Sequence, residues 1–323
     1  MNYENFKEEL QQEILARSLR HIEFLTETMT KANETLEGLV IKFEGQSIAP
    51  TIYPQKMYES YMDGASVSEI VDYISPSIFS TIDYPAMPEL TVANAEKSIS
   101  FSLLNKEKNA ELMADCPYKE VHDMIAIPRW HISDNASFVV TNYVMQQLKM
   151  TKEEVLDIAQ RNTEKADYSC ERIDSVMKEA MLNEGIDEEV IDEFLSMGPS
   201  PLHVITNKTF SDGSCAILSK PFMQKVSEQI GNDELFILPS SRHEMLVVNP
   251  DIIGDPAALK SMVMDVNNDP SVIRSEDFLS NSIYKYNAKT HNISMCDSKG
   301  IFHDKGTLRS AEQGISRRGK GIC

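Results

Sequence analysis

The sequence has few of the residues that mark disulfide-stabilised, fibrous or disordered chains. Its 323 residues include 5 cysteines, 13 glycines and 14 prolines. The cysteine count is odd and no two cysteines form a C-x-x-C pair, so we predict neither a disulfide framework nor a zinc site. Glycine and proline are too sparse for a collagen-like or low-complexity chain. We expect a globular protein with reduced thiols, as in the cytoplasm.

Long apolar runs are also missing. No stretch approaches the ~18 consecutive apolar residues that cross a membrane, and residues 1–10 are too charged for a signal peptide. We therefore expect a cytoplasmic protein without a membrane partner.

Positive charge is scarce as well. Lysine and arginine total 31 against 50 aspartates and glutamates, which gives a net charge of −19. Residues 304–323 carry five basic and two acidic residues, so the acidic excess lies entirely in the rest of the chain. Such a body repels phosphate backbones, and we expect no nucleic-acid partner. We predict that residues 304–323 form a disordered basic tail.

Apolar periodicity alternates between helical and strand-like segments without a strict order. Phe6, Leu10 and Ile14 recur every four residues, which predicts an amphipathic helix over residues 2–16. Residues 20–30 fit either a strand or a helix. Strands or hairpins are predicted at 39–53, 99–104, 124–131, 138–140, 202–206, 235–238, 245–248 and 283–295, and helices at 105–114, 141–149, 151–197 and 256–265. This mixture predicts an α+β fold with a mixed sheet and flanking helices.

Two helix starts are marked by a Ser or Thr followed three residues later by Glu. Ser66 with Glu69 and Thr151 with Glu154 match the capping-box pattern. Residues 84–94 contain two prolines and little periodicity, which favours a lobe boundary there. We predict an N-terminal, hairpin-containing lobe at 1–90 and a larger lobe at 91–303, with one continuous domain as the alternative.

The densest polar cluster is Pro239-Ser240-Ser241-Arg242-His243-Glu244, between two apolar runs. Loops that join buried strands often carry function. In one interpretation Ser240, Ser241, Arg242 and His243 bind a ligand. In a second, Ser241 acts as nucleophile or substrate anchor, His243 as base and Glu244 as the group that orients it. In a third, the cluster only braces the turn, with Ser and Glu satisfying backbone amides.

Other candidate sites are incomplete in sequence. Residues 265–276 resemble a calcium loop, but Pro270 occupies the position that needs glycine. Acidic residues at 188–193 lack the E-x-x-H pattern of a di-metal site. Cys215 could act with His243, although a buried thiol is the simpler interpretation. We predict no metal site and no cofactor.

Several features of the sequence occur together: residues 38–53 with the I-A-P-T-I-Y run at 48–53, residues 105–109, Asp123, the predicted helix at 151–163, and Leu238 followed by the P-S-S-x-H-E motif at 239–244. In these features the chain resembles one uncharacterised bacterial family, a domain of unknown function found in Gram-positive gut anaerobes. Residues 138–250 are more distantly similar to the uncharacterised YtpQ-like proteins, from which the chain departs by a longer acidic region at 164–198. The resemblance implies a bacterial cytoplasmic globular protein and transfers no catalytic residue.

No complete catalytic constellation is recognisable in the sequence. The residues therefore favour a non-enzymatic binding or regulatory protein whose partner is a protein or a small molecule. The alternative is a hydrolase-like enzyme that uses Ser241, His243 and Glu244, which requires these groups to converge on one pocket.

Overall fold

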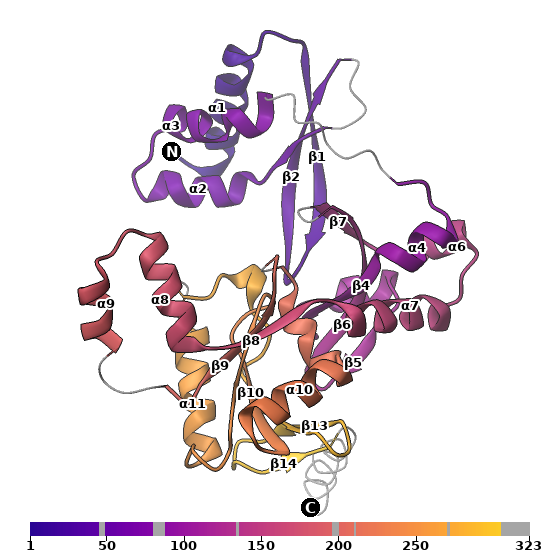
Figure 1. The fold of residues 1–323 in the computed structure, drawn as a ribbon. Coiled ribbons are helices and arrows are strands. Elements are labelled where there is room, and N and C mark those ends of the chain that lie inside the picture. The colour runs from indigo at the N-terminus through magenta and orange to yellow at the C-terminus, as the bar shows by residue number, and fades with distance from the viewer. Residues whose placement is uncertain are drawn as a thin grey trace, which may run out of the picture. The chain divides into compact units, whose positions relative to one another are not determined.

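The computed structural model describes residues 1–44, 49–79, 88–133, 136–195, 200–209, 211–269 and 272–304. The chain divides into two compact units, residues 1–87 and 88–323 (Figure 1). Both contain helices and antiparallel strands, which confirms the α+β class. The predicted basic tail lies outside the described residues from position 305 onward. Within the described ranges, no helix is long and apolar enough to cross a membrane.

The first unit packs three helices with a three-stranded sheet of order β1-β2-β3. Its elements are α1 (Tyr3–Arg17), β1 (Ile22–Lys31), β2 (Glu34–Phe43), β3 (Thr51–Ile52), α2 (Pro54–Met62) and α3 (Val67–Phe79). Phe6, Leu10 and Ile14 are fully buried along α1, as their spacing predicts. They share one apolar cluster with residues of β2 and α3.

The ambiguous segment at 20–30 is a strand. It pairs with β2 from Ile22–Phe43 to Lys31–Glu34, and this long ladder decides between the two predicted conformations. The predicted hairpin at 39–53 is confirmed in its pairing, since Leu39 lies opposite Ile52. Residues 45 and 46 of the turn predicted at 44–46 lie outside the described residues.

The second unit contains a smaller sheet built around one central strand. The strands are β4 (Ile99–Asn105), β5 (Lys119–Val121), β6 (Met124–Ser133) and β7 (Ala136–Val139), and β6 pairs with all three others. Helix α7 (Lys152–Lys165) runs along β4. The remaining helices of this part are α4 (Val92–Ser98), α5 (Ala110–Asp115) and α6 (Asn142–Leu148).

A larger sheet completes the second unit, with order β14-β13-β12-β10-β11-β9-β8. Its strands are β8 (Tyr168–Arg172), β9 (His203–Asn207), β10 (Glu234–Pro239), β11 (Met245–Val248), β12 (Tyr284–Asn287), β13 (Asn292–Cys296) and β14 (Phe302–His303). The helical elements are α8 (Ile173–Asn183), α9 (Glu188–Leu195), η1 (Gly213–Leu218), α10 (Lys220–Ile230), α11 (Pro256–Asn267) and η2 (Ser275–Asp277).

The strands β10 and β11 are buried on both faces, as their continuous apolar runs predict. Ile237 and Val247 point into a core shared with the smaller sheet, α7 and α10. Leu238 and Val248 point into a second cluster against α11. Because both faces of β10 and β11 are covered, the loop at 240–244 that joins them is anchored at each end by a buried strand.

Two details differ from the prediction. The strand pairs in the described residues are all antiparallel, in three sheets and not in one mixed sheet. Two parallel neighbours must be joined by a long crossover connection. In this sheet β10–β11 and β12–β13 are instead hairpins, and β11 lies between β9 and β10. The predicted helical region at 151–197 is also interrupted by β8, because Tyr168–Arg172 pairs with β9.

Candidate functional site

The loop between β10 and β11 contains every residue of the predicted polar cluster after Pro239. Ser240 Oγ donates to Glu244 Oε1 at 3.0 Å. The Ser241 N–H donates to the Glu244 carbonyl at 3.2 Å, and Ser241 Oγ accepts the His243 N–H at 3.0 Å. Both serines and Glu244 thus close the turn on itself, which is the bracing role.

His243 is held through both ring nitrogens. Nδ1 accepts the Asp212 N–H at 3.4 Å, and Nε2 lies 2.9 Å from Asp277 Oδ1. Since Nδ1 accepts, Nε2 carries the proton and donates to Asp277. The side chains of Ser241, His243 and Glu244 therefore do not hydrogen-bond to one another, because each has a different partner.

Arg242 extends from the loop to a buried carboxylate. Its Nη2 donates to Asp212 Oδ1 at 2.7 Å, and the same oxygen accepts the Ser102 hydroxyl at 2.7 Å. Asp212 is only 5% exposed. Burial alone would raise the pKa of Asp212, but the charge of Arg242, the Ser102 hydrogen bond and the charge of Arg129 outweigh it, so that pKa is lowered. Asp212 is consequently ionised at neutral pH.

The backbone of the 239–244 loop is in direct contact with the backbone of the segment that carries Asp212. A Cβ on Gly213 would lie 2.3 Å from the His243 carbonyl oxygen and 2.5 Å from Thr206 Oγ1. The same carbonyl accepts the Thr206 hydroxyl at 2.8 Å, and the Arg242 carbonyl accepts the Ser214 hydroxyl at 2.6 Å. Only glycine fits at this crossing without displacing backbone.

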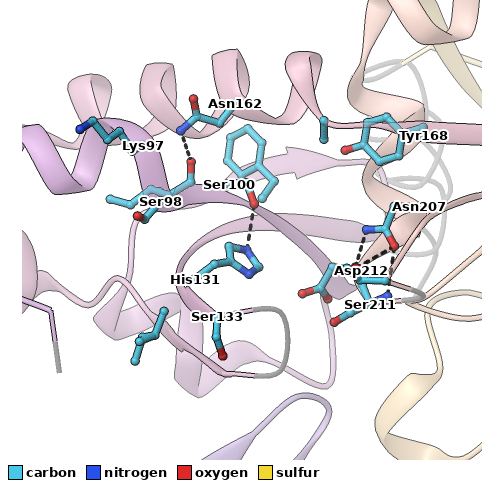
Figure 2. A pocket seen from close by; sticks show the side chains of 15 residues that line it. Lys97, Ser98, Ser100, His131, Ser133, Asn162, Tyr168, Asn207, Ser211 and Asp212 are labelled. Atoms are coloured by element: carbon cyan, nitrogen blue, oxygen red, sulfur yellow. Dashed lines mark hydrogen bonds between the residues drawn. The ribbon is translucent and has the colours of Figure 1, made fainter. Parts of the chain in front are cut away.

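Asp212 also borders a polar cavity of about 390 Å³ within the second unit (Figure 2). Polar side chains from separate elements line it, among them Lys97 from α4, Ser100 from β4, His131 from β6, Tyr168 from β8 and Asn207 from β9. The volume suits a small organic molecule. The cavity thus gathers groups that are more than one hundred residues apart in the chain.

Ser100 and His131 face each other across two paired strands. Ser100 lies opposite Arg129 in the register, so His131, two residues further, projects from the same face. Ser100 Oγ lies 2.9 Å from His131 Nε2 (Figure 2). Burial lowers the pKa of His131, the charge of Arg129 lowers it further, and the charge of Asp212 opposes both. The imidazole is therefore neutral at pH 7.

Two polar atoms at the cavity keep free hydrogen-bonding capacity. In the described part of the chain, neither Asp212 Oδ2 nor the Tyr168 hydroxyl has a hydrogen-bond partner. Figure 2 shows the hydroxyl end of Tyr168 turned toward the side of the cavity that holds Ser100 and His131. Burial raises the pKa of Tyr168, and Cys215 and Asp212 raise it further, so this hydroxyl stays protonated and can donate.

A second cavity, of about 490 Å³, is mainly apolar and lies along α11. Leu202, Leu246 and Met262 are among the side chains that line it, and Ser240 borders it. Ser240 thus lies at a different cavity from Asp212, the partner of Arg242. The predicted ligand-binding set is divided between two places.

The other sequence candidates are structural in their contacts. The Cys215 thiol donates to the Phe101 carbonyl at 3.0 Å, and burial raises its pKa well above the usual range, so it is not a thiolate. Cys116, Cys170 and Cys296 are also free thiols. Asp265 lies within α11, and residues 270–271 are outside the description. Among the residues with described placement, no group of three or more metal-ligating side chains could hold an ion.

A family model described as a family of unknown function (DUF5688) matches residues 3–288. The chain belongs to this family. The match spans the DUF5688 segments that form the polar cavity as well as the 239–244 loop. No curated protein and no solved structure shows significant similarity to the chain.

Two of the segments that carried the family resemblance, residues 105–109 and Asp123, make structural hydrogen bonds in this DUF5688 chain. Asn105 Nδ2 donates to the Leu279 carbonyl at 2.8 Å. Asn109 Nδ2 donates to the Asn105 carbonyl at 2.7 Å. Asp123 accepts hydrogen bonds from the hydroxyls of Tyr284 and Ser280. Their contacts are those of buried structural polar groups.

Sequence reasoning missed Ser100, His131, Tyr168 and Asp212. A signal was present for Ser100: Ser100 and Ser102 interrupt the apolar run Ile99–Leu104 at alternate positions, which marks one polar strand face. Nothing in the sequence shows that this face meets Asp212. That encounter depends on how the two sheets of the second unit pack.

Proposed function

We propose that this chain binds a small, neutral, hydroxyl-bearing molecule in the polar cavity. One observation carries the proposal: Asp212 is almost fully buried, yet its Oδ2 has no partner among the described residues at a cavity of ligand size. Oδ2 is not one of the fully buried unpaired side-chain atoms of the described residues, so it is accessible from the cavity and can accept a hydrogen bond there. A ligand hydroxyl can donate to Oδ2 in the place of water.

The charges around Asp212 favour a neutral ligand. Arg242 already balances the carboxylate at 2.7 Å, so a cationic ligand would compete with Arg242 and an anionic one would face Asp212 directly. Besides Lys97 and His131, the rest of the lining offers mainly hydroxyl and amide groups, such as Ser100, Tyr168 and Asn207. These groups both donate to and accept from hydroxyls, as recognition of a sugar-like or nucleoside-like compound requires.

The 239–244 loop has a supporting role in this proposal. Arg242 pairs with Asp212, and His243 accepts the Asp212 N–H, so both act on the ligand through Asp212. This assigns Arg242 and His243 to positioning, in place of direct ligand contact. The partner is then a small molecule, and we place the protein in a bacterial cytoplasm, in keeping with its free cysteines.

Isothermal titration calorimetry of the full chain tests the proposal. The probes are ribose, glucose, myo-inositol and adenosine, each titrated at neutral pH. We expect saturable one-to-one binding of at least one probe. Tyr168→Phe removes one hydroxyl donor worth about 1 kcal/mol, so we expect about fivefold weaker binding of that probe.

The matched control is Tyr143→Phe. Tyr143 lies on α6, is 64% exposed and does not line the cavity, so its loss of a hydroxyl leaves affinity unchanged. Absence of heat with all four probes, or equal affinity of the wild type and Tyr168→Phe, would contradict the proposal.

A further inference from the structure

We propose that Ser100 and His131 form a nucleophile–base pair that cleaves small polar esters in the same cavity. The inference rests on the proposed binding function and goes beyond it. It depends on the 2.9 Å contact between Ser100 Oγ and His131 Nε2, and on the position of both side chains at the cavity of about 390 Å³. A serine hydroxyl within hydrogen-bond reach of a neutral imidazole is the arrangement that activates a serine.

The surroundings keep His131 able to accept a proton. Its pKa is lowered by burial and by Arg129, so the neutral form persists below the usual histidine range. The charge of Asp212 stabilises the imidazolium once it has formed. Arg129 is held by the Ser137 hydroxyl and carbonyl and does not compete for Ser100.

The reaction balances with the ester and water alone. Ser100 gives its proton to His131 Nε2 while Oγ adds to the ester carbonyl, and the resulting imidazolium protonates the departing alcohol as the carbon–oxygen bond breaks. Water then adds to the acyl-serine, again giving a proton to His131, which returns it to Ser100 Oγ as the carboxylic acid leaves. The products are one acid and one alcohol.

The tetrahedral oxyanion requires a hydrogen-bond donor. The Tyr168 hydroxyl lines the same cavity and has no hydrogen-bond partner in the described part of the chain. Its pKa is raised, mainly by burial, so it keeps its proton through the reaction. Tyrosine hydroxyls are among the groups that serve as oxyanion donors.

The test is covalent labelling of the full chain with an ethyl fluorophosphonate, followed by intact mass measurement and peptide mapping. Attack by Ser100 Oγ on phosphorus expels fluoride and leaves one adduct. We expect a single adduct on Ser100, none with Ser100→Ala, and labelling at least about 100-fold slower with His131→Gln. Ser294→Ala, on β13 and away from the cavity, should label like the wild type.

A pH profile separates catalysis from a merely structural contact. With p-nitrophenyl acetate, the acid limb of the initial rate should lie below the ordinary histidine pKa of about 6.5, because protonated His131 cannot accept the serine proton. A rate that falls already above that pH, an adduct on Ser241, or no adduct at all would overturn the inference.

Calorimetry on the same samples distinguishes the two proposals. Probe binding without an adduct leaves the binding function and removes the esterase inference. An adduct on Ser100 without probe binding supports the nucleophile and removes the ligand class stated above.

Discussion

Asp212 connects two features that are distant in the sequence. Its Oδ1 accepts from Arg242 of the 239–244 loop and from Ser102 of β4, and its backbone N–H donates to His243. Its own φ is 55°, in the left-handed region where few residues other than glycine are found. Asp212 therefore links the 239–244 loop to the lining of the polar cavity, so a substitution at Asp212 is expected to affect both.

The crossing next to Asp212 gives a prediction for Gly213. In Gly213→Ala the new methyl would overlap the His243 carbonyl oxygen and Thr206 Oγ1. One of these atoms belongs to the backbone and the other to a hydrogen-bonded side chain, so neither can move away without loss of stability. We expect the free energy of unfolding to fall by about 1–3 kcal/mol, measured by urea denaturation.

Gly254→Ala is the matched control. Nothing lies within 4 Å of a Cβ placed on Gly254, so the same substitution adds no overlap there. Equal stability of Gly213→Ala and Gly254→Ala would show that the loop and the Asp212 segment are not in backbone contact.

At the scale of single residues, sequence patterns located contacts within an element but not between elements. The turn-closing bonds of Ser240, Ser241 and Glu244 follow from their short spacing, and bracing was one of the predicted interpretations. The pairing of Ser100 with His131 spans 31 positions, and that of Ser102 with Asp212 spans 110. Such pairs depend on sheet register and sheet packing, which no local pattern specifies.

Helix starts are the elements that local chemistry determines most directly. Both predicted capping boxes are confirmed: Ser66 exchanges hydrogen bonds with Glu69, and Thr151 with Glu154. Val155, the residue after the second box, is fully buried. The cap therefore fixes where α7 begins and how its apolar face meets β4.

This role of Thr151 gives a prediction for α7. Thr151→Ala removes the acceptor of the Glu154 N–H, and we expect the chain to lose about 1 kcal/mol of unfolding free energy. Thermal and urea unfolding of the two proteins gives the difference. Glu153→Gln changes the same turn without touching the cap, so a loss as large as that of Thr151→Ala would mean that first-turn charge dominates.

The strand β8 could not be predicted from its local sequence. Tyr168–Arg172 is short, polar and at the edge of its sheet, and it lies between two helices. Its sequence differs little from the acidic helical stretches around it, and its pairing with β9 decides its conformation. By contrast, β10 and β11 were predictable because continuous apolar runs require burial on both faces.

For the whole molecule, the acidic balance and the separation of the cores are the dominant properties. A net charge of −19 opposes binding to other polyanions. Among the described residues, each apolar cluster lies within one unit: one within residues 6–79, two within residues 90–302. A unit with its own core can open without the other, so the predicted division into lobes can be tested by measuring local opening.

Separate cores make a prediction for Ile14→Ala. Ile14 is fully buried in the first unit, so its truncation should lower the stability of that unit by about 2–5 kcal/mol. In hydrogen-exchange mass spectrometry of the full chain, we expect faster exchange in α1 and β1–β2. Peptides from β10 and β11 should exchange as in the wild type, because none of the described residues in their clusters belongs to the first unit. Leu235→Ala, buried in the second unit, should give the reverse pattern. Faster exchange in both units after either substitution would mean that the chain opens as one cooperative body, with the two cores stabilising each other.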